Sequence, residues 1–372
     1  MIKLRVIQAR YGDCLILESG AGKRRKYILV DGGPSKVYQP YLRPELEQIA
    51  AQGGRLGLVI LTHVDTDHVI GLLEMMRDLK QQRASGQPGP VEIDAMWHNA
   101  FQQIMPEIGQ EAAVIEEDVH LSVPADELQD VSFGIGDGEQ LRLADDVLGI
   151  PRNAAYPDPE KLVRLESAPR PLRMLGMRLW VLGPTTANLE TLKRAWLDWV
   201  ASHAAVSFAV GEEVKPDDSV NNLSSIMLLA ESGSGKKLRR ILLTGDGLGS
   251  DVVAGLESAG LLKSGAAFHV DILKLPHHGS ARNVIGPRGN PADFFDRVLA
   301  NTYLISADGR HDNPDWDTLC WLTDASSRQH RPIEIVATNP TDNLTRLLAE
   351  RPPENYCYHL TILSSGQRSI TL

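Results

Sequence analysis

The chain has 372 residues, of which 42% are hydrophobic, and a formal net charge of −10. This length and composition predict a packed globular core rather than a disordered chain. The acidic balance leaves no basic stripe to hold nucleic acid by counterion release, which disfavours a non-specific nucleic-acid binder, although bound metal ions would supply local positive charge.

The cysteines and the N-terminal stretch bear on the compartment. Cys14, Cys320 and Cys357 are scattered without CxxC spacing, and such a sparse, odd set suits a reducing environment better than a disulfide framework. The N-terminal stretch lacks the apolar segment of a signal peptide, and no apolar run is long enough to span a bilayer. The sequence therefore predicts a cytoplasmic protein without membrane association.

The first 82 residues alternate between strand and helix patterns, with turn residues between them. Strands are expected at residues 3–7, 14–18, 26–30 and 58–61, and helices at 44–51 and about 69–82. The run at 58–61 is entirely apolar, as expected of a strand that is buried on both faces. This alternation predicts a layered α/β architecture.

From residue 83 to 215 the pattern loosens, with Gly/Pro breaks, an acidic mixed stretch and a Pro-rich piece. One strand at 177–182 and one helix at 189–200 are expected within it. We predict that 83–215 is an insertion or lid within a single domain of residues 1–372. Further strands are expected at 225–230, 240–243, 270–273, 303–306, 333–337 and 359–363.

The strongest chemical signal is the hexapeptide HVDTDH, which spans His63 to His68 and follows a predicted buried strand. On one continuous helix its two histidines, Asp65 and Asp67 would splay around the axis, whereas a strand-to-helix loop lets them converge. Imidazole plus carboxylate suits zinc, manganese or iron. The alternative is a polar turn in which Asp65 or Asp67 caps the next helix, which explains one aspartate but neither histidine.

Two later turns carry further residues that can bind metal. Asp246 lies between two glycines at the end of an apolar strand, where the backbone can approach a metal closely and a carboxylate can bridge two cations. His277 and His278 are adjacent and follow a strand and a proline. Each of these two turns, taken alone, is also compatible with a simple solvated turn.

In type and order, Asp31, HVDTDH, TGD and PHHGS resemble the motifs of the metallo-β-lactamase superfamily. The Gly12-Asp13 turn, the VDGG strand end, the stretch Asn221-Asn222-Leu223-Ser224, LLTGD and PHHGS are most similar to the hydrolase domain of the competence ComEC/Rec2 group and its soluble relatives. The resemblance spans roughly residues 1–82 and 219–310. It implies a four-layer αββα sandwich, here with a mixed α/β insertion, and two divalent metal ions, zinc or manganese, at one edge of the sheets.

The resemblance also implies a role for each matching residue. The first metal would be held by His63 and Asp65, the second by Asp67, His68 and one of His277 or His278, and Asp246 would bridge the two. His278, which precedes the glycine, fits the last ligand of the superfamily better, so His277 would contact a ligand or donate a proton. Asp31 would form a hydrogen bond to a ligand and orient it.

The chain departs from the superfamily pattern in two places. Asp65 stands where histidine is commoner, which hardens the first site and favours manganese over zinc. The histidine of the third motif is absent, and Asp218 occupies a comparable place with Asn221 and Asn222 close by. We therefore expect the first metal to be held weakly or not at all.

Two other histidines are weaker candidates. His98, beside a tryptophan, would either reach metal or substrate from the insertion or be a packed structural residue. His311 lies near the place where the ComEC/Rec2 group carries a Gly-His-Pro turn, and it would either face the cleft or lie on a solvated turn.

The implied activity is hydrolysis by a metal-activated water, with Asp67 or His277 moving a proton and residues 83–215 covering the cleft and selecting the substrate. The first hypothesis is a phosphodiesterase or nuclease, for which nucleic acid is one candidate substrate. The second is a hydrolase of small esters, thioesters or amides. The third is a non-catalytic binding module with a vestigial metal site. The sequence indicates no partner protein.

Overall fold

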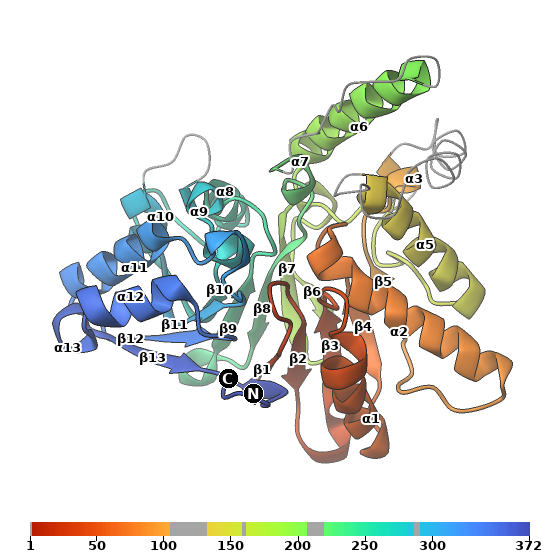
Figure 1. Cartoon of the computed structure of the whole chain (residues 1–372), viewed down its shortest axis with the longest axis horizontal. Helices are drawn as coiled ribbons and strands as arrows, with labels where there is room; N and C mark the ends of the chain where they lie inside the picture. The colour runs from red at the N-terminus through yellow and green to blue at the C-terminus, as the bar shows by residue number, and fades with distance from the viewer. Residues whose placement is uncertain (1, 105–131, 158–160, 207–218, 286–290) are drawn as a thin grey trace.

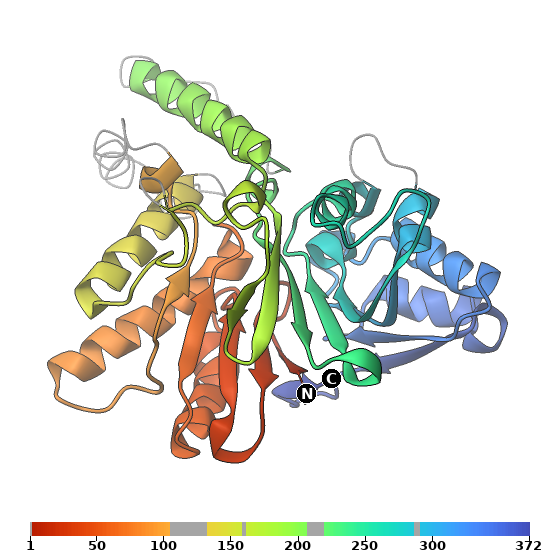
Figure 2. The ribbon, with the colours of Figure 1, turned by 180° about the vertical axis from the view of Figure 1, so that it is seen from behind.

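Two β-sheets face each other, and helices cover the outer face of each (Figure 1; Figure 2 shows the same layers from behind). The computed structural model describes residues 2–104, 132–157, 161–206, 219–285 and 291–372. This arrangement confirms the predicted four-layer αββα sandwich. Within the described ranges, no helix combines the length and the apolar character needed to cross a membrane.

The first sheet is mixed, and its strand order brings several loops to one edge. In spatial order its strands are β14 (Ser369–Thr371), β1 (Lys3–Ile7), β2 (Leu15–Ser19), β3 (Lys26–Val30), β4 (Leu56–Ile60) and β5 (Met96–Trp97). β1, β2 and β3 pair antiparallel, whereas β3, β4 and β5 pair parallel. The turn after β1 therefore lies at the same edge as the carboxyl ends of β3, β4 and β5.

The second sheet is also mixed. In spatial order its strands are β13 (Tyr358–Ile362), β12 (Ile333–Ala337), β11 (Val298–Ile305), β10 (Phe268–Lys274), β9 (Arg239–Leu243), β8 (Met227–Ser232), β7 (Met177–Gly183) and β6 (Leu172–Met174). β9 to β13 pair parallel, and β6 to β9 pair antiparallel. The loops after β9 and β10 thus share one edge of this sheet, because parallel strands end on the same side.

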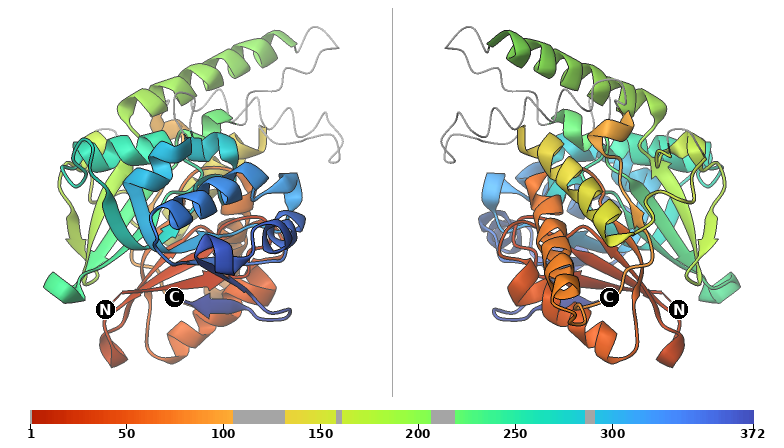
Figure 3. Two further views of the ribbon diagram at one scale, coloured as in Figure 1. Left: turned by 90° about the vertical axis from the view of Figure 1, so that its left-hand side faces the viewer. Right: turned by 90° about the vertical axis from the view of Figure 1, so that its right-hand side faces the viewer.

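The helices complete the outer layers and the connections. Among the described residues they are α1 (Arg43–Ala51), α2 (Thr66–Ala84), α3 (Phe101–Ile104), α5 (Ser132–Leu148), α6 (Thr186–Val206), α7 (Ser219–Asn222), α8 (Gly249–Ser258), α9 (Ala281–Ile285), α10 (Pro291–Arg297), α11 (Trp316–Arg328), α12 (Asp342–Glu350) and α13 (Pro353–Tyr356). α1, α2 and α5 cover the first sheet, and α8 and α10 to α12 cover the second. In the side views, α6 lies beyond one end of the sandwich (Figure 3).

Apolar side chains fill the three spaces between the four layers. The central cluster joins the inner faces of both sheets, for example Leu17 and Ile28 with Leu228 and Ile241. Each outer cluster joins one sheet to its covering helices. Alternate residues of a strand point to opposite faces, so strands such as β2 and β9 contribute to two clusters at once. Packing on both faces makes the strand ends a rigid base for the loops that follow.

The described parts of the interval 83–215, which the sequence predicts to be an insertion or lid, contribute to both sheets of the sandwich. They supply β5 to the first sheet and β6 and β7 to the second, so backbone pairing places these strands inside the sandwich. α5 packs its Leu141 and Ala144 into the outer cluster of the first sheet. Whether other parts of this interval cover a cleft stays a prediction.

Candidate metal centre

Four of the predicted ligands lie where β4 is followed by α2, with His63 and Asp65 on the connecting loop and Asp67 and His68 in the first turn of the helix. β4 ends at Ile60 and α2 begins at Thr66, so the hexapeptide occupies a strand-to-helix junction, as its pattern predicts. Asp65 takes the position before the helix in an extended backbone conformation, but its side chain makes no capping hydrogen bond. Capping of α2 therefore does not account for this residue.

The second sheet contributes Asp246, His277 and His278. Asp246 follows β9, and the two histidines follow β10 in a short turn, Pro276–Gly279. His277 and His278 have φ values of 42° and 56°. This left-handed conformation costs a non-glycine residue about 1–2 kcal/mol, so the surrounding packing must hold the turn in place.

One carboxylate oxygen lies at the centre of four imidazoles. Oδ2 of Asp246 is 3.3 Å from Nε2 of His68 and 3.3 Å from Nε2 of His278. It is 3.6 Å from Nε2 of His277 and 3.9 Å from Nε2 of His63. One strand-to-helix connection of the first sheet and two connections of the second, far apart in the chain, therefore place these nitrogen atoms around a single oxygen.

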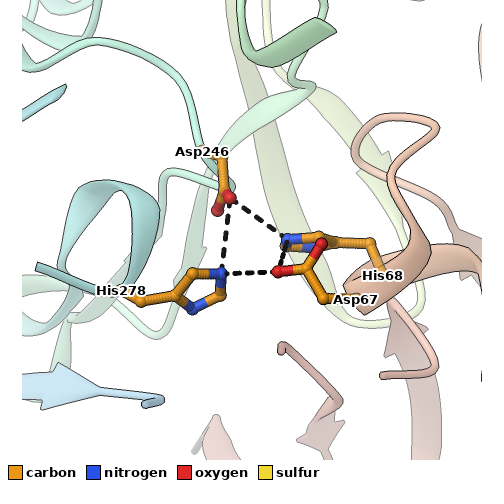
Figure 4. A group of neighbouring side chains, drawn as sticks. All are labelled: Asp67, His68, Asp246 and His278. Carbon is orange, nitrogen blue, oxygen red and sulfur yellow. Dashed lines mark hydrogen bonds and ion pairs between the residues drawn. The ribbon is translucent and has the colours of Figure 1, made fainter. Parts of the chain in front are cut away.

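The tightest group is formed by Asp67, His68, Asp246 and His278 (Figure 4). Oδ2 of Asp67 is 3.1 Å from Nε2 of His278 and 3.6 Å from Nε2 of His68. One ligand atom from each of the four residues lies within 4.8 Å of the others. Two imidazoles and two carboxylates in this space form a donor set that suits a divalent transition metal.

The neighbouring group around His63 is looser. Its Nε2 lies 3.2 Å from Oδ2 of Asp65, and Asn221 donates a hydrogen bond of 3.0 Å to the other oxygen of that carboxylate. Nδ2 of Asn222 lies 3.3 Å from Nδ1 of His277. Asp218, the proposed substitute for the third-motif histidine, lies outside the described residues.

Asp31 orients two of the imidazoles. Its Oδ2 lies 2.9 Å from Nδ1 of His68 and accepts a hydrogen bond of 2.9 Å from the hydroxyl of Thr62. Since that hydroxyl gives its proton to Asp31, it can only accept from Nδ1 of His63, which is 3.0 Å away. Both rings thus carry a proton on Nδ1 and turn Nε2 toward Asp246, where a bound metal would take the place of any proton on Nε2.

The two Nε2 atoms that face Asp246 lack a hydrogen bond of good geometry to any described residue. Nε2 of His63 and Nε2 of His68 are buried and make no hydrogen bond within the described part of the chain. An unsatisfied buried polar atom is costly, so two such nitrogens beside carboxylate oxygens have the arrangement that a cation site requires. A divalent cation would satisfy both nitrogens, and the residues present therefore fit a metal centre.

Charges in this group strongly perturb one another. Burial disfavours the imidazolium form of His68, but the surrounding carboxylates, Asp246 first, outweigh burial and raise the pKa of His68 well above its usual value. For His278, too, burial opposes the charge and Asp246 outweighs it, raising the pKa to about 9. The imidazoles in turn outweigh burial for Asp67 and Asp246 and hold the pKa of each carboxyl well below its usual range. Metal binding would replace these imidazole protons.

The sequence interpretation missed a buried lysine beside this group. Lys274 ends β10, and its ammonium lies 2.5 Å from Oδ2 of Asp13 and 3.3 Å from Oδ1 of Asp246. Both Lys274 and Asp13 are fully buried. A lysine directly after the apolar pair Ile272-Leu273, at the end of a strand, was the available signal, because charged residues are rarely buried without a partner.

The two weaker histidine candidates lie apart from the group. Nε2 of His98 is 2.8 Å from Oδ2 of Asp145 on α5, and both side chains are buried, as expected of a packed structural residue. His311 is exposed on the turn Arg310–Asp312. Neither contacts the metal-competent group within the ranges that the structure covers.

Residues 8–143 match the family model of the metallo-beta-lactamase superfamily, whose members are mostly hydrolases and typically bind divalent metals. The matched segment contains Asp31 and the whole of HVDTDH, and it ends before the loops that carry Asp246 and His278. The two mixed sheets with outer helices agree with the α/β sandwich of that superfamily. A search of curated proteins finds no match to the chain. The likeness to the ComEC/Rec2 group stays a prediction.

Proposed function

We propose, from the superfamily match over residues 8–143, that this protein is a metal-dependent hydrolase that cleaves phosphodiester bonds. One observation carries the proposal. Oδ2 of Asp246 lies within 3.9 Å of Nε2 atoms from four histidines, two on loops of each sheet. Such convergence of titratable side chains is typical of a catalytic or metal centre rather than of core packing.

The donor atoms divide into two sites that share Asp246. In this proposal His63 and Asp65 would hold the first metal, Asp67, His68 and His278 would hold the second, and Asp246 would contribute to both sites. Zinc or manganese suits this mixture of imidazole and carboxylate. When bound, a metal pair would lower the pKa of a water molecule toward neutrality and polarise the substrate oxygen. The second site is the more complete one, and we expect it to fill first.

Asp67 and His277 are placed to meet the substrate. The side chain of His277 is 31% exposed and that of Asp67 is 20% exposed, whereas the side chain of Asp246 is only 2% exposed. Nδ1 of His277 lies 2.9 Å from Oδ1 of Asn283, which fixes the ring and leaves Nε2 facing the centre. A group that is both held and accessible can hand a proton to a leaving group, so we assign this role to His277 or Asp67.

A nearby arginine supports an anionic substrate over a neutral ester. The guanidinium of Arg310 lies 3.9 Å from the centre of the Tyr11 ring. Tyr11 lies on the turn whose Asp13 donates a backbone hydrogen bond of 3.3 Å to the carbonyl of Asp67. Arg310 forms no ion pair with a described carboxylate, and both Arg310 and Asp67 lie close enough to Tyr11 to act on its pKa, so the charge of Arg310 is available to a phosphate group at the centre.

Metal analysis and two chromogenic substrates test this proposal. Protein loaded in turn with zinc and manganese should hydrolyse bis(p-nitrophenyl) phosphate, and Asp67→Ala and Asp246→Ala should abolish that activity. Asp78→Ala is a matched control, because Asp78 is a carboxylate of the same helix α2 that bonds only to residues outside the metal centre. The control should remain active.

Other outcomes would contradict the proposal in different ways. Hydrolysis of only p-nitrophenyl acetate or a thioester would favour the hypothesis of a small-ester hydrolase over that of a phosphodiesterase. Protein without bound metal and indifferent to chelators would indicate a binding module instead. For an active protein, a panel of single- and double-stranded DNA, RNA and cyclic nucleotides would identify the class of phosphodiester.

A further inference from the structure

A buried ion pair lies directly behind the metal centre, between Asp13 of the first sheet and Lys274 of the second. The ammonium of Lys274 donates to Oδ2 of Asp13 at 2.5 Å, to the carbonyl of Gly245 at 2.9 Å and to Oδ1 of Asp246 at 3.3 Å. An ammonium has three protons, and these three acceptors use them all. Burying a charge is costly unless it is fully paired, so this lysine must hold its geometry tightly.

The contact with Lys274 decides which oxygen of Asp246 faces the histidines. Lys274 occupies Oδ1, while Oδ2 points to the imidazoles of His68 and His278 at 3.3 Å each. The backbone N–H of Asp246 also donates to the hydroxyl of Ser225 at 3.2 Å. Rotation of the carboxylate would break the bond to Lys274, so the lysine restrains Oδ2 at its position.

Asp13 extends the same restraint to His278. Its second oxygen, Oδ1, lies 3.7 Å from Nδ1 of His278, and both atoms are buried without a hydrogen bond to any described residue. A movement of about 0.7 Å would bring them to hydrogen-bond distance. Asp13 would then do for His278 what Asp31 does for His68, namely hold the Nδ1 proton and keep Nε2 free for a metal.

We propose that Asp13 and Lys274 are positioning residues, which set Oδ2 of Asp246 and Nε2 of His278 on one point and thereby determine metal affinity without touching the ion. This inference rests on the metal sites of the proposed function but not on hydrolysis. Its test therefore measures metal binding, so a failure of the phosphodiesterase assignment leaves the test intact.

The direction in which Lys274→Met changes metal affinity distinguishes a positioning role from a simple electrostatic one. Lys274→Met removes a positive charge beside a cation site, which on charge alone would strengthen metal binding. Positioning predicts the opposite, a loss of 10–100-fold in affinity, as is usual when a residue that orients a metal ligand is removed. Asp13→Asn should weaken binding to a similar degree, since it removes the negative charge that pairs with Lys274 and leaves only one oxygen to accept from either Lys274 or His278.

The double variant Asp13→Asn/Lys274→Met tests whether the two residues act as one unit. If they do, the loss of affinity in the double variant should be close to that of the weaker-binding single variant rather than the product of both losses. A multiplicative loss would show two independent effects and overturn the pair as a unit. Asp13→Asn by itself keeps the test available if Lys274→Met does not fold.

Competition of the full chain with a chromophoric chelator for zinc and manganese measures the affinities, and circular dichroism verifies folding. The visible spectrum of cobalt-loaded protein gives a second readout, because it reports the ligand geometry and should change in Lys274→Met. Glu231→Gln is a matched control. Glu231 is also a buried carboxylate with ion pairs, to Arg178 and Arg240, but it lies toward the opposite end of β8.

Each result of this experiment decides the matter. Weaker binding and an altered cobalt spectrum in Lys274→Met, with Glu231→Gln unchanged, would support the inference. Wild-type affinity or tighter binding in folded Lys274→Met, with an unchanged spectrum, would overturn it. A wild-type chain that binds no metal would overturn both this inference and the proposed metal centre.

Discussion

Replacement of Asp31 by asparagine should reverse the protonation pattern of two histidines. At the position of Oδ2, an amide nitrogen would donate where the carboxylate now faces Nδ1 of His68 and accepts from the hydroxyl of Thr62. His68 would have to give up its Nδ1 proton and carry its proton on Nε2, and the freed Thr62 hydroxyl would donate to His63 and favour the same change there. If the asparagine amide were flipped, its nitrogen would face the backbone N–H of Thr62, which now donates to Oδ1 of Asp31 at 2.8 Å. Two donors would then face each other, so this orientation is disfavoured.

The expected magnitude follows from these contacts. Loss of one residue that orients a metal ligand costs 10–100-fold in affinity, and since Asp31 governs two ligands we expect about 100-fold, which is about 2.7 kcal/mol. Backbone strain should contribute little to this loss of affinity, because Asp31 has φ 58° and asparagine tolerates that left-handed conformation. The change therefore isolates the hydrogen bonds of the side chain.

Isothermal titration with zinc or manganese measures this loss, and Asp78→Asn provides the control. Asp78 also accepts two strong hydrogen bonds, from Tyr38 at 2.6 Å and from Arg43 at 2.8 Å, but it contacts no residue of the metal centre. In a His68→Ala background, Asp31→Asn should reduce metal affinity much less, because one of the two histidines that Asp31 orients is already absent. Wild-type affinity in Asp31→Asn, or an equal loss in Asp78→Asn, would refute the reasoning.

Two further predictions concern packing and pH. In Gly12→Ala the new Cβ would lie 1.9 Å from the carbonyl oxygen of Asp67. We therefore expect the free energy of unfolding to fall by about 1–3 kcal/mol and metal binding to weaken. Unchanged calorimetric and metal-titration curves would contradict this. Burial, opposed in part by Arg77, raises the pKa of Asp137 from 3.8 to about 6. The folded state therefore favours the protonated form, and this contribution to stability is present below about pH 4 and lost as pH rises through about 6. Asp137→Asn should match wild type in acid and exceed it by about 1–3 kcal/mol at pH 8 in urea unfolding, whereas parallel pH profiles would contradict the assignment.

The sequence by itself determined the local parts of this protein. The apolar pattern at 333–337 coincides with β12, and the hexapeptide follows β4 as predicted, although α2 begins at Thr66 and includes its last three residues. These features depend on the period of apolar residues and on turn chemistry, which are properties of neighbouring residues. The residue types able to bind metal could be identified for the same reason, since each motif is contiguous.

Only the tertiary structure decided which of these parts meet. Asp67 and His278 are 211 positions apart, yet their side chains lie 3.1 Å from each other. β5, β6 and β7 join the sheets from an interval with a weak local pattern, because strand pairing depends on the partner as much as on the strand. The burial of Lys274 against Asp13 likewise arises from the docking of one sheet on the other. Long-range packing sets these contacts, and no stretch of neighbouring residues contains the information to specify them.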